Sequence, residues 1–188
     1  MAEAALNRRA PKRRNAPETK ARILAAAQRL FAAHGYAATG MRDIADAAEV
    51  AVSLLPLHFG SKAALFESAL RDAAGPSRLS SMPRETLGKS LIEYMLDKND
   101  LSLPSMVVLS IGDPEARAIA IRVLRERGID DMAELLGSPD AEARALEFLM
   151  LATGFVLYAR RLPLIPVAER TKARFASLLQ SIFDGDEQ

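Results

Sequence analysis

The residue types of this chain are best suited to contact with phosphate groups. Thr39 and Arg42 are expected at the start of one short helix, and Lys62 in the first turn of another. A helix N-terminus attracts anions through its free N–H groups and its dipole. Because cations stabilise helix C-termini, Lys62 is poorly placed for its own helix, and an external anion would explain it better than solvent would. We predict that these three residues contact phosphates.

The sequence offers little for catalytic or metal chemistry. It contains no cysteine, and its two histidines, His34 and His58, both lie in the first third of the chain. Hydrolytic triads, thiolate sites and zinc sites are therefore not expected. Gly35, Gly40 and Gly60 fit turns better than a loop that cradles phosphates. We expect neither an enzyme nor a bound metal or cofactor.

Positive charge is concentrated at the start of the chain. The net charge is only +1, yet the first 30 residues contain eight Lys or Arg and two Glu, a local net charge of +6. Such a segment favours a polyanion, since Lys and Arg release counterions from phosphates. We interpret residues 1–16 as a flexible basic arm. A disordered solubilising tail would have the same composition.

The residues that follow the arm predict short helices with clear ends. Apolar residues at helical spacing indicate a first helix over residues 18–34, closed by Gly35. A second helix is expected after Thr39 as its N-cap, followed by a turn over residues 49–51. Together with the two helices after that turn, they define an N-terminal domain over residues 17–75. Two short helices joined by a tight turn can place the second in a DNA major groove.

Pro56 limits where the third helix can begin. A proline in a helix interior costs about 3 kcal/mol, through a lost hydrogen bond and a clash with the preceding turn. With Ala51 as N-cap, Pro56 would be the fifth helical residue; with Ser53 as N-cap it is the third, where its N–H would be free anyway. We predict a helix shortened at its start, capped near Ser53 and ending near Phe59. Ser61 then caps a fourth helix.

Three segments of this domain carry a family resemblance. They are ILAAAQRLFAAHGY in the first helix, TGMRDIA at the second, and HFGSKAALF at the start of the fourth. In these segments the chain resembles the TetR family of bacterial transcriptional regulators. The resemblance implies a three-helix helix-turn-helix DNA-binding domain in a homodimer that binds double-stranded DNA at a palindromic operator. It also implies a C-terminal domain whose small-molecule ligand moves the two DNA-binding heads out of register.

Two residues depart from the pattern of that family. Members usually carry glycine at the position of Glu49 and an aromatic residue, typically Tyr, at that of Pro56. Glu49 must adopt a turn geometry that glycine adopts freely, and its carboxylate would repel phosphates. Both departures weaken the expectation of specific DNA binding.

The third helix presents few groups that can read base edges. Leu54 and Leu57 could contact thymine methyl groups, but Arg, Lys, Asn and Gln are absent. Specificity would then depend on Ser53, His58, DNA shape and the basic arm. The predicted DNA contacts are Thr39, Arg42, Ser53, Leu54, Leu57, His58 and Lys62. The alternative is that DNA binding is weak or lost and the apolar patch packs against protein.

The loop PSRLSSMPR, residues 76–84, marks the boundary to a second domain over residues 84–185. We expect this ligand-binding and dimerisation domain to bring the total to about nine helices. The segment Ala145 to Tyr158 is apolar nearly all round and needs cover on more than one side. With the apolar stripe of a last helix that starts at Pro166, it predicts a homodimer interface formed by the last two helices. An internal core is the alternative.

A small ligand would lie between the helices of this second domain. The candidate wall residues are Tyr94, Met106, Leu109, Met150, Thr153, Phe155 and Tyr158. Their few polar groups predict a small apolar or amphipathic effector, although each residue could instead belong to the core.

Composition supports an all-α fold, because Ala and Leu abound while aromatic residues are only 5% of the chain. No apolar run is long enough to cross a membrane and no secretion signal precedes the basic residues, so we expect a cytoplasmic protein. The function that fits best is a ligand-responsive DNA-binding transcriptional regulator, a repressor. The second hypothesis is a ligand-binding or protein-interaction module of the same fold that has lost sequence-specific DNA recognition.

Overall fold

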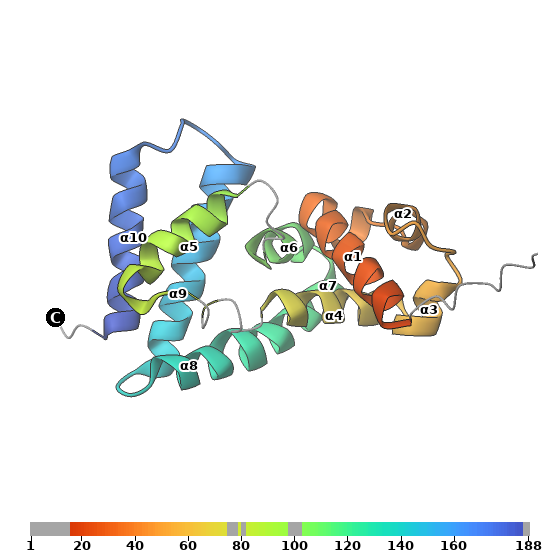
Figure 1. Cartoon of the computed structure of the whole chain (residues 1–188), viewed down its shortest axis with the longest axis horizontal. Helices are drawn as coiled ribbons and strands as arrows, with labels where there is room; N and C mark the ends of the chain where they lie inside the picture. Colours follow the sequence, from red (N-terminus) through yellow and green to blue (C-terminus); the bar gives the residue numbers. More distant parts are fainter. Residues whose placement is uncertain (1–15, 75–78, 80–81, 98–102, 186–188) are drawn as a thin grey trace, which may run out of the picture.

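The computed structural model describes residues 16–74, 79, 82–97 and 103–185. Within these ranges the chain is all-α, as predicted, and no residue lies in a strand. The molecule is elongated, with α1–α3 at one end, α9 and α10 at the other, and α4, α6 and α7 between them (Figure 1). No helix in the described part is long and apolar enough to cross a membrane. Residues 1–15 of the predicted basic arm lie outside these ranges.

The α-helices and the shorter helical segments follow one another along the whole described chain. They are α1 (Ala16–Ala38), α2 (Met41–Ala47), α3 (Leu54–Phe59), α4 (Lys62–Ala73), η2 (Arg84–Thr86), α5 (Leu87–Leu96), α6 (Leu103–Ser110), α7 (Pro114–Val123), η3 (Leu124–Asp130), α8 (Asp131–Leu136), α9 (Ala141–Val156), η4 (Leu157–Arg161) and α10 (Glu169–Asp184).

Gly35 ends the regular part of α1 close to the predicted position. Its φ of 78° and ψ of 174° interrupt the helical backbone, although a short helical stretch continues to Ala38. The predicted cap of α2 was wrong: Gly40, and not Thr39, is the N-cap, and its N–H donates to the Asp43 carboxylate at 3.0 Å. Thr39 is buried, and its hydroxyl donates to the carbonyl of Gly35 at 2.7 Å. The Thr39 hydroxyl thus holds the end of α1, and Gly40 occupies the cap position of α2.

The start of α3 confirms the prediction made from Pro56. α3 begins at Leu54 with Ser53 in the N-cap position, although the Ser53 side chain makes no capping bond. Pro56 is therefore the third helical residue. The carbonyls of Ala51 and Val52 accept bonds from the two residues before Pro56. At this position an N–H would have no acceptor within the helix, so the missing N–H of proline costs α3 no internal hydrogen bond.

Two hydrophobic cores divide the molecule at a point that the sequence did not indicate. The first core combines α1–α4 with Met106 from α6 and four residues of α7, namely Ala116, Ile119, Ala120 and Val123. The second core is formed by α5, η3, α8, α9 and α10. The chain thus passes the predicted boundary at residues 76–84 and then returns in α6 and α7 to complete the first core.

The later helices depart from the expected pattern in two places. The kink expected at Gly128 takes the form of π-helical backbone over Leu124–Asp130, between α7 and α8. α10 begins at Glu169 instead of Pro166, because residues 162–168 form a loop in which Leu164 and Ile165 are 79% and 76% exposed. The apolar stripe of α10 is buried mainly through Leu179, Ile182 and Phe183.

Candidate nucleic-acid interface and apolar cavity

The turn between α2 and α3 is held from α1. Glu49 has a φ of 52°, the left-handed geometry expected at this position, and a non-glycine residue there costs about 1–2 kcal/mol. The Arg22 guanidinium donates to the carbonyls of Ala48 and Glu49 and lies 3.5 Å from the Glu49 carboxylate. Arg22 thus offsets part of the strain and part of the negative charge that Glu49 brings to the turn.

α3 is anchored in the core by one buried residue, and its outer face is apolar. Leu55 is completely buried, whereas Leu57 is 74% exposed and Ser53 is also exposed. Leu54 and His58 are half-buried. Of the predicted base contacts, Ser53 and Leu57 are thus the most accessible. A leucine at this place can contact a thymine methyl group but cannot form hydrogen bonds to base edges.

The three predicted phosphate contacts have different surroundings. Arg42 is exposed in the first turn of α2. Thr39 is only 2% exposed and bonds within the chain, which corrects the prediction that its hydroxyl reaches phosphate. Lys62 is half-buried, with its Nζ 4.4 Å from the centroid of the Tyr36 ring. This cation–π contact gives Lys62 an internal partner that the sequence did not reveal.

Tyr36 connects this part of the molecule to α6 and α7. Its hydroxyl donates to the Glu115 carboxylate at 2.6 Å, and its N–H donates to Ser110 Oγ at 2.9 Å. Burial, and then the bond to Glu115, raise the pKa of Tyr36 above its ordinary value. Tyr36 therefore stays protonated as a donor, and Lys62 is linked through it to α7.

Sequence reasoning did not single out Lys20 as a contact. Its Nζ lies 5.5 Å above the centroid of the Phe59 ring at the end of α3, and its side chain is exposed. The only signal was its membership in the basic first 30 residues. Exposed Asp43 and Asp46 on α2 oppose this positive charge. The face thus carries both signs of charge around an apolar α3.

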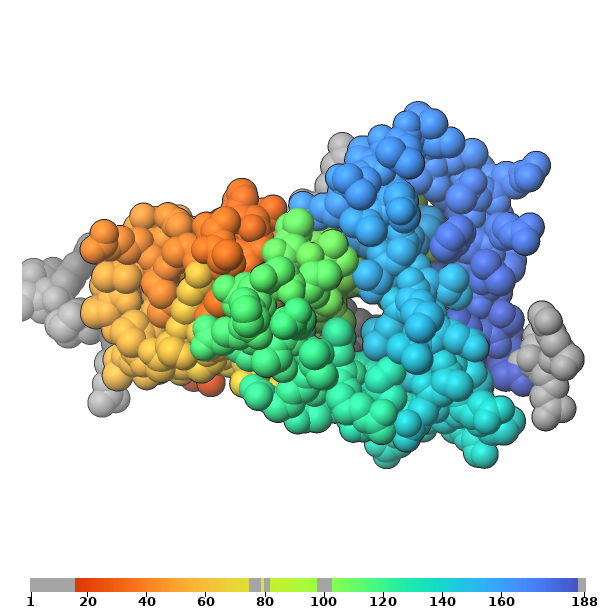
Figure 2. All heavy atoms as spheres, turned by 180° about the vertical axis from the view of Figure 1, so that it is seen from behind, coloured from red at the N-terminus to blue at the C-terminus, as the bar shows by residue number. Residues whose placement is uncertain are grey.

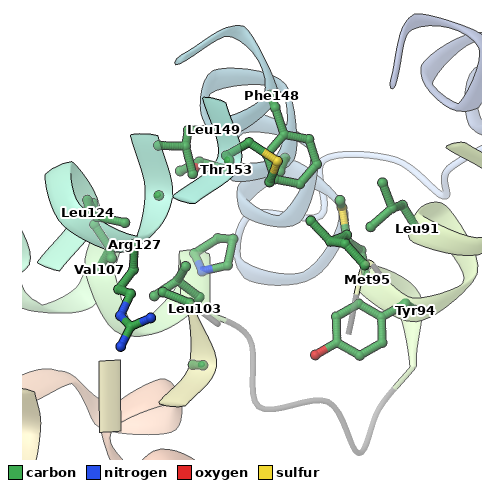
Figure 3. Close-up of a pocket in the computed structure, with 17 residues that line it drawn as sticks. Leu91, Tyr94, Met95, Leu103, Val107, Leu124, Arg127, Phe148, Leu149 and Thr153 are labelled. Carbon is green, nitrogen blue, oxygen red and sulfur yellow. The ribbon is translucent and has the colours of Figure 1, made fainter. Parts of the chain in front are cut away.

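A cavity of about 140 Å³ lies where α4, α5, α6, η3 and α9 meet. Its walls are mainly apolar, with Phe148 and Leu149 on one side and Leu91, Met95 and Leu103 around the rest (Figure 3). Three polar side chains take part among the described residues: Tyr94, Arg127 and Thr153. Such a site fits a mainly apolar ligand with one polar group.

The structure does not bring the seven predicted ligand contacts into one site. Tyr94 and Thr153 line the cavity. Met150, Phe155 and Tyr158 instead line an open groove between the other side of α9 and the loop that precedes α10. The remaining two are elsewhere: Met106 is completely buried in the first core, and Leu109 is 39% exposed on α6. A helix that is apolar all round has two faces, and the sequence did not distinguish them.

Arg127 and Gly128 are cavity residues that sequence reasoning missed. Arg127 is the only charged residue among the described residues of the wall, and its Nη1 donates to the Asp131 carboxylate at 2.9 Å. A Cβ added at Gly128 would lie 3.1 Å from Leu149 Cδ1, so glycine here leaves room in the cavity. The glycine in the middle of a long helical pattern was the only signal, and it suggested a kink alone.

Ion pairs join the wall of the cavity to α4. Glu67 on α4 accepts hydrogen bonds from Arg71 at 3.0 Å and from Arg122 at 2.6 Å. Arg71 also pairs with Glu126 of η3 at 2.7 Å. Burial raises the pKa of Glu67, but the bonds from both arginines outweigh it and hold that pKa below its usual range.

Arg161 makes a second link between the two cores. From η4 it donates to the carbonyl of Ala32 in α1 and, at 3.2 Å, to Ser105 Oγ in α6. Burial and the neighbouring Arg160 lower the pKa of Arg161. The guanidinium thus links η4 to both α1 and α6.

Family models match both parts of the chain. The model for bacterial regulatory proteins of the tetR family matches residues 23–69, and the model for the tetracyclin repressor-like C-terminal domain matches residues 85–183. No curated protein sequence matches this chain.

Several solved structures share the fold. NalD from Pseudomonas aeruginosa, the secondary repressor of the MexAB-OprM multidrug efflux pump, is 22% identical with a TM-score of 0.58 over 91% of this chain and 97% of its own. FadR from Bacillus halodurans, a fatty acid degradation regulator, is 19% identical with a TM-score of 0.60 over 89% and 95%. The multidrug binding protein EbrR, solved with proflavin, is 20% identical with a TM-score of 0.55 over 87% and 99%.

Proposed function

The chain belongs to the tetR family of bacterial regulatory proteins, and from that premise we propose that it is a ligand-responsive repressor acting as a homodimer in the cytoplasm. It binds a palindromic operator through α2, α3, the start of α4 and the basic arm. An apolar or amphipathic effector in the cavity weakens that binding. Dimer symmetry requires two half-sites about one helical turn apart, or a multiple of that distance.

The observation that carries this proposal is the reach of α4. Lys62 stands in its first turn beside α3, whereas Ala73 and Ala74 at its other end line the cavity. α4 is a continuous helix of 12 residues, and a rigid secondary element can transmit a movement between distant sites. A ligand that shifts the cavity end of α4 would therefore also shift Lys62 and the neighbouring α3.

The pairing of Arg71 with Glu126 supports the same coupling. It joins α4 to η3, the segment that also provides Arg127 and Gly128 to the cavity. Any change of the π-helical backbone in η3 would thus act on α4 through charged contacts as well as through packing.

Apolar side chains on the last two helices support the homodimer. They are Leu146 and Met150 on α9, Tyr158 on the adjoining η4 and Leu178 on α10, with exposures of 46%, 63%, 57% and 41%. α9 and α10 lie at the end of the molecule opposite α1–α3 (Figure 2). A second copy would cover these side chains and leave both heads open to DNA.

Two of the structural neighbours agree with repression and effector binding. NalD is described as a repressor, and EbrR was solved with proflavin, a flat aromatic molecule. At 20–22% identity the likeness to this chain is one of fold. Their ligands therefore support the general role of an effector-binding regulator and not a particular effector for this chain.

The test is selection of DNA from random and genomic libraries by the purified full chain, repeated across a salt series. The expected result is a palindrome bound with nanomolar-scale affinity at physiological salt. Weak, unselective binding that falls steeply with salt would overturn the proposal, because the basic arm alone would then account for it.

One feature favours the second candidate function, a ligand-binding or protein-interaction module without specific DNA recognition. The outer face of the helix-turn-helix exposes Leu57 at 74% and Val52 at 46%, and the turn that leads into it carries the exposed carboxylate of Glu49. An apolar patch next to an acidic turn suits a protein surface better than a phosphate backbone.

The substitution Pro56→Tyr discriminates between the two candidates. It restores the aromatic residue that is usual for the family at a position that is exposed here. A large gain in DNA affinity would show that the native α3 is compromised and favour the second candidate. Unchanged, selective binding would show that α3 already docks in its own way.

A further inference from the structure

The cavity has the size of a single aromatic ring. Its volume is about 140 Å³, and an apolar protein cavity of about 150 Å³ is known to bind benzene. A single ring would fill most of this space, whereas a long acyl chain or a fused multi-ring molecule would extend out of it. Phe148 and Met95 provide an aromatic face and a polarisable thioether, both of which pack favourably against a ring.

Arg127 gives the cavity one positive charge. Nη1 of the guanidinium is bonded to the Asp131 carboxylate, and the Arg127 side chain is 45% exposed. Because a guanidinium has five N–H donors in a fixed fork, it can bind a second carboxylate while it keeps the first. In Figure 3 the Arg127 guanidinium and the Tyr94 hydroxyl both lie on the side of the cavity away from Phe148.

Charge argues against a cationic ligand. No Asp or Glu lines the cavity among its described residues, and a cation would lie beside Arg127 without a partner there. A neutral hydrocarbon would leave the guanidinium unused. A planar carboxylate matches the fork of Arg127 in shape as well as in charge.

We propose that the effector is a small aromatic carboxylate, with its ring against the apolar wall of the cavity and its carboxylate on Arg127. This inference rests on the proposed effector role of the cavity and adds the chemical class of the ligand. Thr153 lies beside Phe148 on α9 and offers a hydroxyl to a ring substituent.

The test measures the affinity of three matched probes for the full chain by calorimetry. Benzoate has the ring and the carboxylate, toluene has the ring alone, and benzylamine has the opposite charge. Arg127→Gln is expected to weaken benzoate by about tenfold or more, since a charge-assisted pair is lost. Toluene should bind the wild type and Arg127→Gln equally.

Arg125→Gln is the control for charge on the same segment. Arg125 pairs with Asp130 and Glu142 on the surface and is absent from the cavity wall. It should leave benzoate affinity within about twofold, because the charge that it removes is screened by solvent. Arg127→Lys keeps the charge but loses the fork, so an intermediate loss is expected; it also serves if Arg127→Gln does not fold.

Three results would overturn the inference: no binding of benzoate to the wild type, equal benzoate affinity in the Arg127 and Arg125 variants, or tighter binding of benzylamine than of benzoate. If the protein selects an operator but does not bind benzoate, the proposed regulator function stands and the proposed ligand class fails. If the protein binds benzoate through Arg127 but selects no operator, the proposed ligand class stands and the proposed regulator function fails.

Discussion

The two hydrophobic cores differ in how completely they are filled. In the first, the rings of Phe31, Tyr36 and Phe66 contact one another with centroids 5.0–6.1 Å apart, and both phenylalanines are completely buried. The second borders the cavity on one side of α9 and the open groove on the other, whereas the first reaches the cavity only through partly buried residues of α4 and α6 at its edge. A closed core fixes the geometry of the face that would meet DNA. A core with space at its edge can respond to a ligand.

The backbone shows the same contrast. Within the described ranges, π-helical segments occur only after α7, at Leu124–Asp130 and Leu157–Arg161. Such segments are often found at functional sites. The first places Arg127 at the cavity, and the second carries Arg161 to α1 and α6. Irregular backbone thus lies where the second core meets the cavity or the first core.

Truncation of one phenylalanine in each core should give the largest contrast. Phe66→Ala is expected to cost about 4 kcal/mol in the free energy of unfolding, because a closed site cannot collapse around the lost ring. Phe148→Ala should cost about 2 kcal/mol, since Phe148 is 8% exposed and already borders free space. Urea denaturation of both variants measures the difference. Equal costs would show that the two cores are equally well packed.

Two glycines with matching backbone geometry test the contact between α1 and α6. Gly35 has φ 78° and ψ 174°, and Gly137 has φ 69° and ψ 169°. Alanine at either position should lower the free energy of unfolding by about 1–3 kcal/mol through backbone strain. At Gly35 the new Cβ would also lie 2.3 Å from the Leu109 carbonyl oxygen, whereas Gly137 faces open space.

Gly35→Ala should therefore be less stable than Gly137→Ala by about another 1–3 kcal/mol, the usual cost of overpacking. Thermal and urea denaturation of the pair isolate this steric part. If the two variants were equally stable, α6 would have to be free to move away from α1 at little cost.

Gly128→Ala should separate stability from ligand binding in the second core. Alanine raises helix propensity by about 0.5–1 kcal/mol, and the flexible Leu149 side chain can yield at 3.1 Å. The same methyl group narrows the cavity, so benzoate affinity should fall while stability rises slightly. Gly154→Ala is the matched control, because its Cβ would meet nothing within 4 Å. A loss of stability at Gly128 alone would mean that the cavity wall is rigid.

The smallest effect is expected at Pro56. Pro56→Ala should change the free energy of unfolding by less than about 1 kcal/mol, because the third helical position needs no N–H donor. Ser68→Pro in the middle of α4 is the contrast and should cost about 3 kcal/mol or more. Chemical denaturation measures both. A large gain from Pro56→Ala would show that α3 is strained after all.

Local signals in the sequence were sufficient for much of the fold. Ser61 and Asp113 cap α4 and α7 through their own side chains, at 3.1 and 3.0 Å from Ala64 N and Ala116 N. Pro56 fixed the start of α3. These features depend on residues a few positions apart, which a single sequence displays directly.

The cavity could be predicted only in part. Tyr94 and Thr153 were identified from their place among apolar residues, but Arg127 looks like any charged residue on a helix. Its role depends on the π-helical backbone of η3 and on the packing of α9 against it. Met150, predicted together with them, lines the groove on the other face of α9, and the sequence of an apolar helix does not indicate which face borders which space. Contacts over long sequence distances decide such questions.

The return of α6 and α7 to the first core limits how this protein can be cut and recombined. A fragment that stops at residue 75 would leave without cover the apolar surface that Met106, Ile119 and Val123 protect. Hybrid regulators that join this head to another effector domain should therefore carry the chain through Val123. The head is a discontinuous unit in sequence, and only the longer fragment can be transplanted as a folded piece.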